Sequence, residues 1–195
     1  MNYLAHIYLS HNKAGLQIGN FIADFVKGSK LNAYPDRIKN GILLHRLIDD
    51  FTDKHPVVKE CVILLRPVFG RYAAIVLDMY FDYFLAKNFR LYSKNHSLTL
   101  TAIKFYGTAL LNYKFLPKKV KRFIFHFILS NRLGKYASMA GLENSLRIMS
   151  FHKISAINPS QCIEFLVNHQ EELELKFHLF FPELIQFCNL QRMRY

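Results

Sequence analysis

The chain has 195 residues, of which 51% are hydrophobic and 15% aromatic, so it can bury a core of its own and is not an extensively disordered protein. This length predicts a single domain over residues 1–195. Twenty-six basic against 14 acidic residues give a formal net charge of +12, which predicts an anionic partner: a nucleic acid, an anionic membrane or an acidic protein.

Segments of helical length follow one another along the chain, separated by asparagine, glycine and proline, and no strand-like alternation persists. Asn2 and Ser97 occupy positions from which a side chain can cap a helix, and Gly28 can end one. In chain order, the helices expected in the first part of the sequence cover residues 2–11, 16–27, 35–51, 56–66, 68–90 and 98–112.

After Pro117, a basic amphipathic helix is expected over KKVKRFIFHFILSNR. Gly134 and Gly141 then bracket a loop that contains a turn of helix. A long C-terminal helix is expected over about 158–180, before Pro182 interrupts it. The sequence therefore predicts an all-α fold, a single-domain helical bundle.

The cysteines point to a reducing compartment. Cys61, Cys162 and Cys188 are far apart and form no zinc-binding spacing, which favours buried thiols. The N-terminus lacks the features of a signal peptide, and the apolar runs are shorter than the roughly 18 residues that span a bilayer. We therefore expect a soluble, cytoplasmic protein without a membrane span.

Two carboxylates stand out because they interrupt AAIVLDMYFDYFLA, one of the most apolar stretches of the chain. Burying Asp78 or Asp82 would cost several kcal/mol unless the group is paired or bound to a cation. Arg71 lies seven residues before Asp78 on the same helix face, so a structural salt bridge is the alternative to a functional role.

Histidines and acids also occur in three other helical segments. His45 and Asp49, in GILLHRLIDD, are one helical turn apart, so they can bind a metal together or form an ordinary surface pair. Asp24, in GNFIADFVKG, can likewise belong to a metal site or form a surface pair with Lys27. His6 is either a ligand or a packed core histidine. Carboxylates and imidazoles that converge from several helices are how helical proteins build metal sites.

Five sequence blocks make the chain resemble the acyl carrier protein phosphodiesterase family, also called acyl carrier protein hydrolase. They are MNYLAHIYLS, GNFIADFVKG, GILLHRLIDDFTDKHP, LDMYFDYFLAKNF and the later LELKFHLFFPEL. Their order and spacing agree from end to end, although residues 97–157 match loosely. The resemblance implies a divergent branch of the helical histidine–aspartate metal phosphohydrolase fold. The chain lacks the adjacent His-Asp dipeptide of the standard branch, so its ligands cannot be copied from that branch.

The resemblance also implies an activity: hydrolysis of the phosphodiester that joins 4′-phosphopantetheine to the serine of holo acyl carrier protein, with manganese as the usual metal. It implies a site whose residues fall in the matching blocks. The expected metal ligands are His6, Asp24, His45 and Asp78. Asp24 and Asp49 are the expected catalytic residues, with Asp49 acting as a ligand or a base. Asp82 would orient one of the metal ligands without binding the metal itself.

The chemistry of these residue types agrees with that activity. Oxygen and nitrogen ligands without thiolate suit manganese, magnesium or iron better than a structural zinc site. Such a cation neutralises phosphoryl oxygens and lowers the pKa of bound water. Lys27 and Arg46 adjoin the expected ligands and could bind the phosphate, or be solvated surface cations.

The basic excess agrees with an acidic acyl carrier protein as partner. We expect four cations to dock this partner: Lys118, Lys119, Lys121 and Arg122. The alternative is that they form the solvated side of an ordinary amphipathic helix. Two other functions stay open: a metal-dependent phosphohydrolase acting on nucleotides or cyclic nucleotides, and a basic nucleic-acid-binding helical protein. Acidic pairs in apolar helices argue against nucleic-acid binding, so no nucleic acid is expected as a partner. The sequence does not determine the oligomeric state.

Overall fold

The computed structural model describes residues 1–152 and 156–192. Within these ranges the chain contains helices and no strand, which confirms the all-α prediction. The α-helices are α1 (Tyr3–Leu9), α2 (Ala14–Ile22), α3 (Asp36–Lys54), α4 (Pro56–Phe69), α5 (Ala73–Lys87), α6 (Phe89–Tyr92), α7 (Leu98–Leu111), α8 (Lys118–Leu129), α9 (Arg132–Lys135), α10 (Met139–His152) and α11 (Pro159–Arg192). Short 3₁₀ helices are η1 (Ala23–Phe25), η2 (Gly28–Ala33), η3 (Gly70–Tyr72) and η4 (Tyr113–Phe115).

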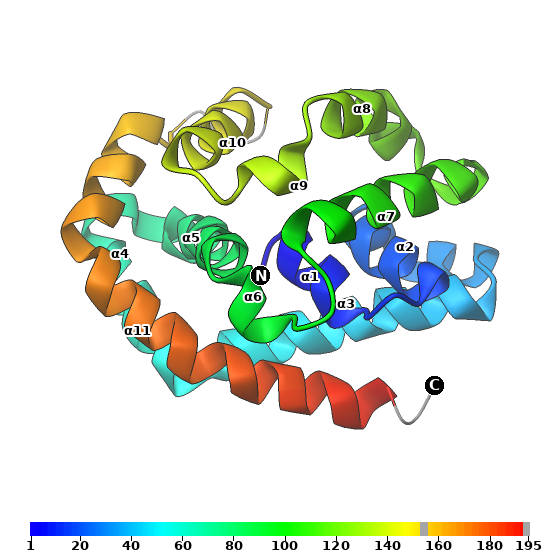
Figure 1. Ribbon diagram of the computed structural model, residues 1–195, viewed down its shortest axis with the longest axis horizontal. Coiled ribbons are helices and arrows are strands. Elements are labelled where there is room, and N and C mark those ends of the chain that lie inside the picture. The colour runs from blue at the N-terminus through cyan, green and yellow to red at the C-terminus, as the bar shows by residue number, and fades with distance from the viewer. Residues whose placement is uncertain (153–155, 193–195) are drawn as a thin grey trace.

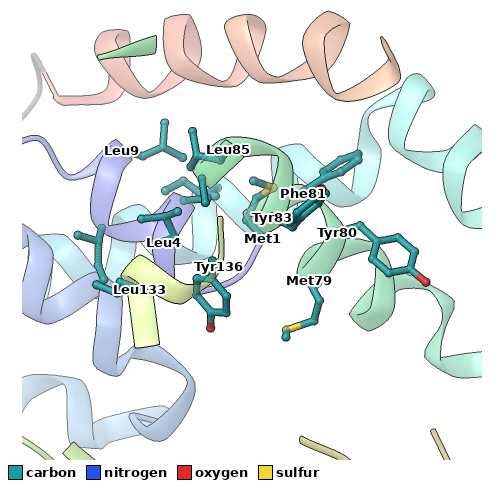
Figure 2. Close-up of a cluster of buried hydrophobic side chains, with 14 of the residues drawn as sticks. Met1, Leu4, Leu9, Met79, Tyr80, Phe81, Tyr83, Leu85, Leu133 and Tyr136 are labelled. Carbon is teal, nitrogen blue, oxygen red and sulfur yellow. The ribbon is translucent and has the colours of Figure 1, made fainter. Parts of the chain in front are cut away.

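The short helix α1 lies in the middle of the molecule (Figure 1), where it packs against α2 on one side and α5 on the other. Seven residues are too few to form a stable helix in water, so α1 depends on its surroundings. Leu4, Ile7 and Leu9 are completely buried and join the main hydrophobic core, part of which Figure 2 shows. The long helices α3 and α11 run along one side of the view.

Helices α2 and α3 cross with their backbones almost in contact. A Cβ atom on Gly19 would lie 2.7 Å from the Cα atom of Gly41, and one on Gly41 would lie 2.8 Å from the Cα atom of Gly19. Only glycine allows this approach. Since His45 lies one turn after Gly41 and Asn20 directly follows Gly19, the crossing brings these two side chains together.

Several helix boundaries differ from those expected. Helix α4 continues through Pro67 to Phe69, so α5 begins only at Ala73. Helix α11 likewise continues through Pro182, and its backbone instead departs from helical geometry at His169. Both prolines therefore lie inside a helix, although proline lacks the amide donor of a helical hydrogen bond.

Helix α10 begins at Met139 and so includes Gly141, where a loop was expected. A side chain on Gly141 would collide with the backbone of Lys135 in α9, so this glycine permits close packing of two helices and does not mark a turn. Ser97 caps α7 as expected, since its hydroxyl accepts a hydrogen bond from the Leu100 amide at 3.1 Å.

All three cysteines are buried, as the sequence indicates, and within the described ranges they form no disulfide with one another. Over the described part of the chain, no helix combines the length and the apolar character that crossing a membrane requires. The predictions of one domain and of a histidine–aspartate phosphohydrolase fold stay predictions.

Candidate metal centre

The N-terminus of α1 is fixed by Asp82 of α5. Its completely buried carboxylate accepts hydrogen bonds from the backbone amides of Leu4 at 2.7 Å and Ala5 at 3.1 Å. These amides have no partner within the helix, so Asp82 replaces a cap that Asn2 does not provide. Burial raises the pKa of Asp82 to about 7 even though both hydrogen bonds lower it. Asp82 therefore holds in place the helix that carries His6.

His6 of α1 and His45 of α3 meet beside Asp49 of α3. The Nε2 atom of His45 lies 3.0 Å from Asp49 Oδ2, and the Nε2 atom of His6 lies 3.3 Å from Asp49 Oδ1. Both imidazoles are buried, whereas the Asp49 side chain is 40% exposed. The expected pair of His45 and Asp49 on one helix face is thus part of a larger cluster.

Asp24 closes the cluster on its solvent side. It lies in η1, directly after α2, and its Oδ1 atom is 3.3 Å from His45 Nε2. Its side chain is 62% exposed, so a molecule in solution can reach it. The carboxylate therefore faces His45, and the surface pair with Lys27 that the sequence left open is not what the structure shows.

Asn20 fixes the orientation of the His45 ring. The Nδ1 atom of His45 lies 2.9 Å from the Asn20 carbonyl oxygen, so Nδ1–H donates to it and Nε2 is directed at Asp24 and Asp49. The Asn20 amide also donates to the His6 carbonyl and to the Ser10 hydroxyl, both at 2.9 Å. Sequence reasoning missed this residue; its place one turn before Asp24, in an apolar helix, was the available signal.

The charges within the cluster stabilise one protonation pattern. Burial lowers the pKa of His45, but hydrogen bonds to Asp24 and Asp49 outweigh it and raise the value to about 9. Burial and the charge of His45 lower the pKa of His6 to about 4. Hydrogen bonds from the histidines hold the pKa of Asp49 well below its usual range despite burial, and the hydrogen bond from His45 lowers that of Asp24. Without a metal, a protonated His45 therefore bridges two carboxylates.

Asp78 lies next to the cluster but outside it. Its Oδ1 atom is 2.9 Å from the Met1 amino group, which is 3.9 Å from Asp49 Oδ1, and the Met1 carbonyl oxygen is 3.1 Å from His6 Nε2. Burial raises the pKa of Asp78, although the Met1 amine opposes this effect. Arg71 lies against Tyr72 instead, so the salt bridge considered for Asp78 has a different cation.

The cluster has the donor set of a divalent cation site. Within the described ranges, His6, His45 and Asp49 form a group that offers ligand atoms within 4.8 Å of one another. His45 keeps Nε2 for a ligand because Nδ1 is hydrogen-bonded, an arrangement common to metal-binding histidines. His6 Nδ1 is buried and has no hydrogen-bond partner among the described residues. Two imidazoles and carboxylates fit manganese, magnesium or iron.

Of the two cations expected to bind phosphate, Arg46 already has a contact. It is exposed and donates from Nη2 to the Val26 carbonyl oxygen at 3.3 Å, which ties α3 to the segment after Asp24. Lys27 directly follows Val26 and is exposed.

The basic helix α8 contacts the segment that carries Asp24 through one aromatic residue, and two of the four cations lie closer to that contact around the helix. Phe123 of α8 packs against Phe25, the neighbour of Asp24, with ring centroids 6.1 Å apart. At about 100° per residue, Lys119 lies about 40° and Arg122 about 100° from Phe123 around the helix axis. Both are exposed.

The other two cations of α8 point elsewhere. Lys118 and Lys121 lie about 140° and 160° around the helix from Phe123. Lys121 lies over the Tyr113 ring, with its Nζ atom 4.9 Å from the centroid, and is half-buried there. The fold therefore divides the four expected docking residues into two pairs.

Comparisons with known proteins identify the family of this chain. A family model described as acyl carrier protein phosphodiesterase matches residues 1–184. The chain is 32% identical over 190 residues to an acyl carrier protein phosphodiesterase of Enterobacter sp., covering 95% of this chain and 96% of that protein. It is 31% identical over 198 residues to one of Klebsiella pneumoniae subsp. pneumoniae, covering 99% and 100%. No solved structure matches the chain. The chain belongs to the acyl carrier protein phosphodiesterase family.

Proposed function

We propose that this enzyme hydrolyses the phosphodiester that links 4′-phosphopantetheine to the serine of holo acyl carrier protein, and that it needs a divalent metal to do so. The family supports the substrate. The observation that carries the proposal is the convergence of His6, His45, Asp49 and Asp24 from three separate segments. Hydrolysis adds water across the bond between phosphorus and the serine oxygen, and that oxygen takes a proton.

The residues that would hold the cation are His6, His45 and Asp49, with Asp24 completing the set on the exposed side. Asp78 is the remaining ligand expected from the sequence. It contacts the Met1 amino group and so would help to position the start of the chain beside the cation. We propose manganese, with magnesium or iron as alternatives. When bound, the cation would supply Lewis acidity, which neutralises charge on phosphoryl oxygens and makes water more acidic.

The protein's own groups would orient the reactants and handle protons. Asp24 is the most exposed group of the cluster and can accept a proton from an attacking water molecule. Asp49 is half-exposed next to it and can take the same role or stay a ligand. Asn20 keeps the His45 ring directed at both carboxylates through its carbonyl oxygen.

The partner in this proposal is the acidic carrier protein, which would meet the enzyme in the cytoplasm. The net charge of +12 favours an acidic partner. Lys119 and Arg122 lie closer around α8 to the Phe123 contact with Phe25 than Lys118 and Lys121 do, so they are the cations best placed to dock it. Lys27 and Arg46 would meet the phosphate or the carrier surface near it.

Intact-protein mass spectrometry of holo acyl carrier protein tests the proposal. Incubation with the enzyme and manganese should convert the carrier to its apo mass, and a chelator should prevent this. Loss of the arm in the presence of chelator would contradict the metal requirement. An unchanged carrier, with metal-loaded enzyme, would contradict the substrate, and hydrolysis of nucleotides or cyclic nucleotides would then be the next activity to measure.

A further inference from the structure

We propose that a cavity at the beginning of α7 binds a phosphate monoester through Gln17 and Thr101. The cavity has a volume of about 240 Å³ and is lined by residues of α1, α2 and their connection, by the segment between α6 and α7, and by α7 itself. None of these lining residues belongs to the histidine–aspartate cluster of the candidate metal centre. The cavity is therefore a separate site, and the inference does not rest on the proposed function.

Gln17 and Thr101 have polar groups that the protein leaves unused. Gln17 is 4% exposed and Thr101 is 7% exposed, and both line the cavity. Their backbone amides bond to Lys13 and Ser97, but in the described part of the chain neither side chain has a hydrogen-bond partner. Neither polar group is sealed off from solvent, so both are reached through the cavity. Because buried polar groups are normally hydrogen-bonded, two unpartnered ones at one cavity indicate a polar ligand.

The charge of the cavity favours an anion. Lys94 and His96 line it, and none of its described lining residues carries a carboxylate. This agrees with the sequence, which has no aspartate or glutamate between Asp82 and Glu143, although basic residues occur throughout that segment. Thr101 lies near the beginning of α7, where the partial positive charge of the helix end adds to the potential. The cavity should therefore attract negatively charged molecules.

Hydrogen bonds hold the walls of the cavity in place. The Tyr8 hydroxyl donates to the Tyr92 carbonyl oxygen at 2.6 Å, which joins α1 to α6. The Nδ1 atom of His96 lies 2.6 Å from the Asn95 carbonyl oxygen, so Nδ1–H donates to it and Nε2 is an acceptor. The Asn12 amide donates to this Nε2 atom at 3.0 Å and joins the connection between α1 and α2 to the same wall. The site is thus formed before a ligand binds.

A second hollow adjoins the cavity and has room for the organic part of a monoester. Its volume is about 330 Å³, and the two share Asn12 and Gln17. Ile103 and Leu111 line the second hollow and are 60% and 86% exposed. A ligand with a phosphate at one end and an apolar portion at the other therefore fits the two hollows together.

A phosphate monoester matches these donors better than a carboxylate does. It offers three strong acceptor oxygens and about 1.5–2 negative charges near neutral pH, whereas a carboxylate has only two oxygens and one charge. Gln17, Thr101 and Lys94 can each donate to a different oxygen. Inorganic phosphate shares this chemistry, and so does the 4′-phosphopantetheine that the proposed reaction would release.

Titration calorimetry of the full-length protein in chelator tests the inference with three probes: inorganic phosphate, 4′-phosphopantetheine and pantetheine. The two phosphates should bind, and pantetheine, which lacks the phosphate, should not. Tighter binding of 4′-phosphopantetheine than of phosphate would support a monoester that fills both hollows, and equal binding would support a site for the phosphate group alone. A wild type without affinity for either phosphate would overturn the inference.

Variants of the lining residues locate the binding. Thr101→Val and Gln17→Leu should each weaken phosphate binding about 10-fold, because each removes a hydrogen bond to an anion. The matched control is Thr99→Val, which changes an exposed threonine of α7 outside both hollows and should keep wild-type affinity. Thr101→Val should also unfold at the wild-type temperature or above, since its hydroxyl has no partner to lose. Wild-type phosphate affinity in Thr101→Val, or a lowered unfolding temperature, would contradict the inference.

This inference and the proposed function can fail separately, because phosphate binding is measured without metal or turnover. Phosphate binding through Thr101 by a protein that leaves holo carrier protein intact would support the inference and contradict the proposed function. Arm release by a protein that has no phosphate affinity in chelator would do the reverse.

Discussion

The imidazole rings of His6 and His45 stack with their centroids 4.0 Å apart and an angle of 17° between their planes. One ring comes from α1 and the other from α3, and Asn20 of α2 contacts both helices through its carbonyl and amide groups. The candidate centre therefore depends on how α1, α2 and α3 pack, and most predictions below test that packing.

The crossing of α2 and α3 should tolerate no side chain. Gly19→Ala or Gly41→Ala forces the two backbones apart, because the added Cβ atom would overlap the facing helix. We expect a loss of about 1–3 kcal/mol in the free energy of unfolding, measured by urea denaturation. Arm release should fall as well, because Asn20 would move relative to His45.

Gly107→Ala is the control for these variants. Gly107 lies in α7 with open space around the position of a Cβ atom, so alanine should be neutral or stabilising by up to about 1 kcal/mol. If Gly41→Ala were as stable as Gly107→Ala, the close approach of the two helices would not be needed.

Removing the carboxylate of Asp82 should release α1. Asp82→Ala leaves the buried amides of Leu4 and Ala5 without a partner, so we expect a loss of about 2 kcal/mol or more and much lower activity. Asp82→Asn keeps one acceptor oxygen and should lose less. Thermal unfolding checks this order, with exposed Asp53→Ala as a control that should behave like the wild type.

In chelator, His45 should stabilise the metal-free protein in a pH-dependent way. Its pKa is raised from 6.5 to about 9 in the folded state, because hydrogen bonds to Asp24 and Asp49 outweigh the opposing effect of burial. A raised histidine pKa contributes stability fully below pH 6.5 and loses it as the pH rises through 9.

Urea denaturation of wild type and His45→Gln across this range measures the contribution. The difference in unfolding free energy should shrink between about pH 6.5 and 9. A difference that stays constant over this range would show that His45 is not held as a cation between the two carboxylates.

Because the basic residues of α8 lie on two sides of the helix, changing one pair should affect the KM for the carrier protein more than changing the other. The double change Lys119→Glu and Arg122→Glu should raise KM for holo carrier protein about 10-fold at low salt with little change in kcat, and added salt should reduce the difference. The double change Lys118→Glu and Lys121→Glu has the same net charge but alters the other side of the helix. Equal KM values for the two variants would show that only net charge matters.

The sequence predicted the helical class and most of the cluster, for reasons that lie in local pattern. His45 and Asp49 share a helix face because they are four residues apart, and the sequence blocks led to His6 and Asp24. The role of Asn20 could not be predicted, because it depends on the approach of α2 to α3. The prediction that Asp78 is a ligand stays a prediction. Its contact with the Met1 amine could not be foreseen, because the path of the chain before α1 is not a periodic feature.

The extent of α10 was missed because Gly141 was taken for a loop residue, and its role in packing against Lys135 is a tertiary one.

The most direct measurement compares Asp49→Asn with Asp50→Asn. The two residues are neighbours on α3, but Asp49 faces both histidines whereas exposed Asp50 pairs with Lys54 at 2.7 Å. Manganese binding and release of phosphopantetheine from holo carrier protein would be measured for each folded variant. Our account predicts that Asp49→Asn binds manganese weakly and releases the arm at least about 100-fold more slowly, while Asp50→Asn matches the wild type. Wild-type binding and turnover by Asp49→Asn would show that the cluster is not the catalytic centre.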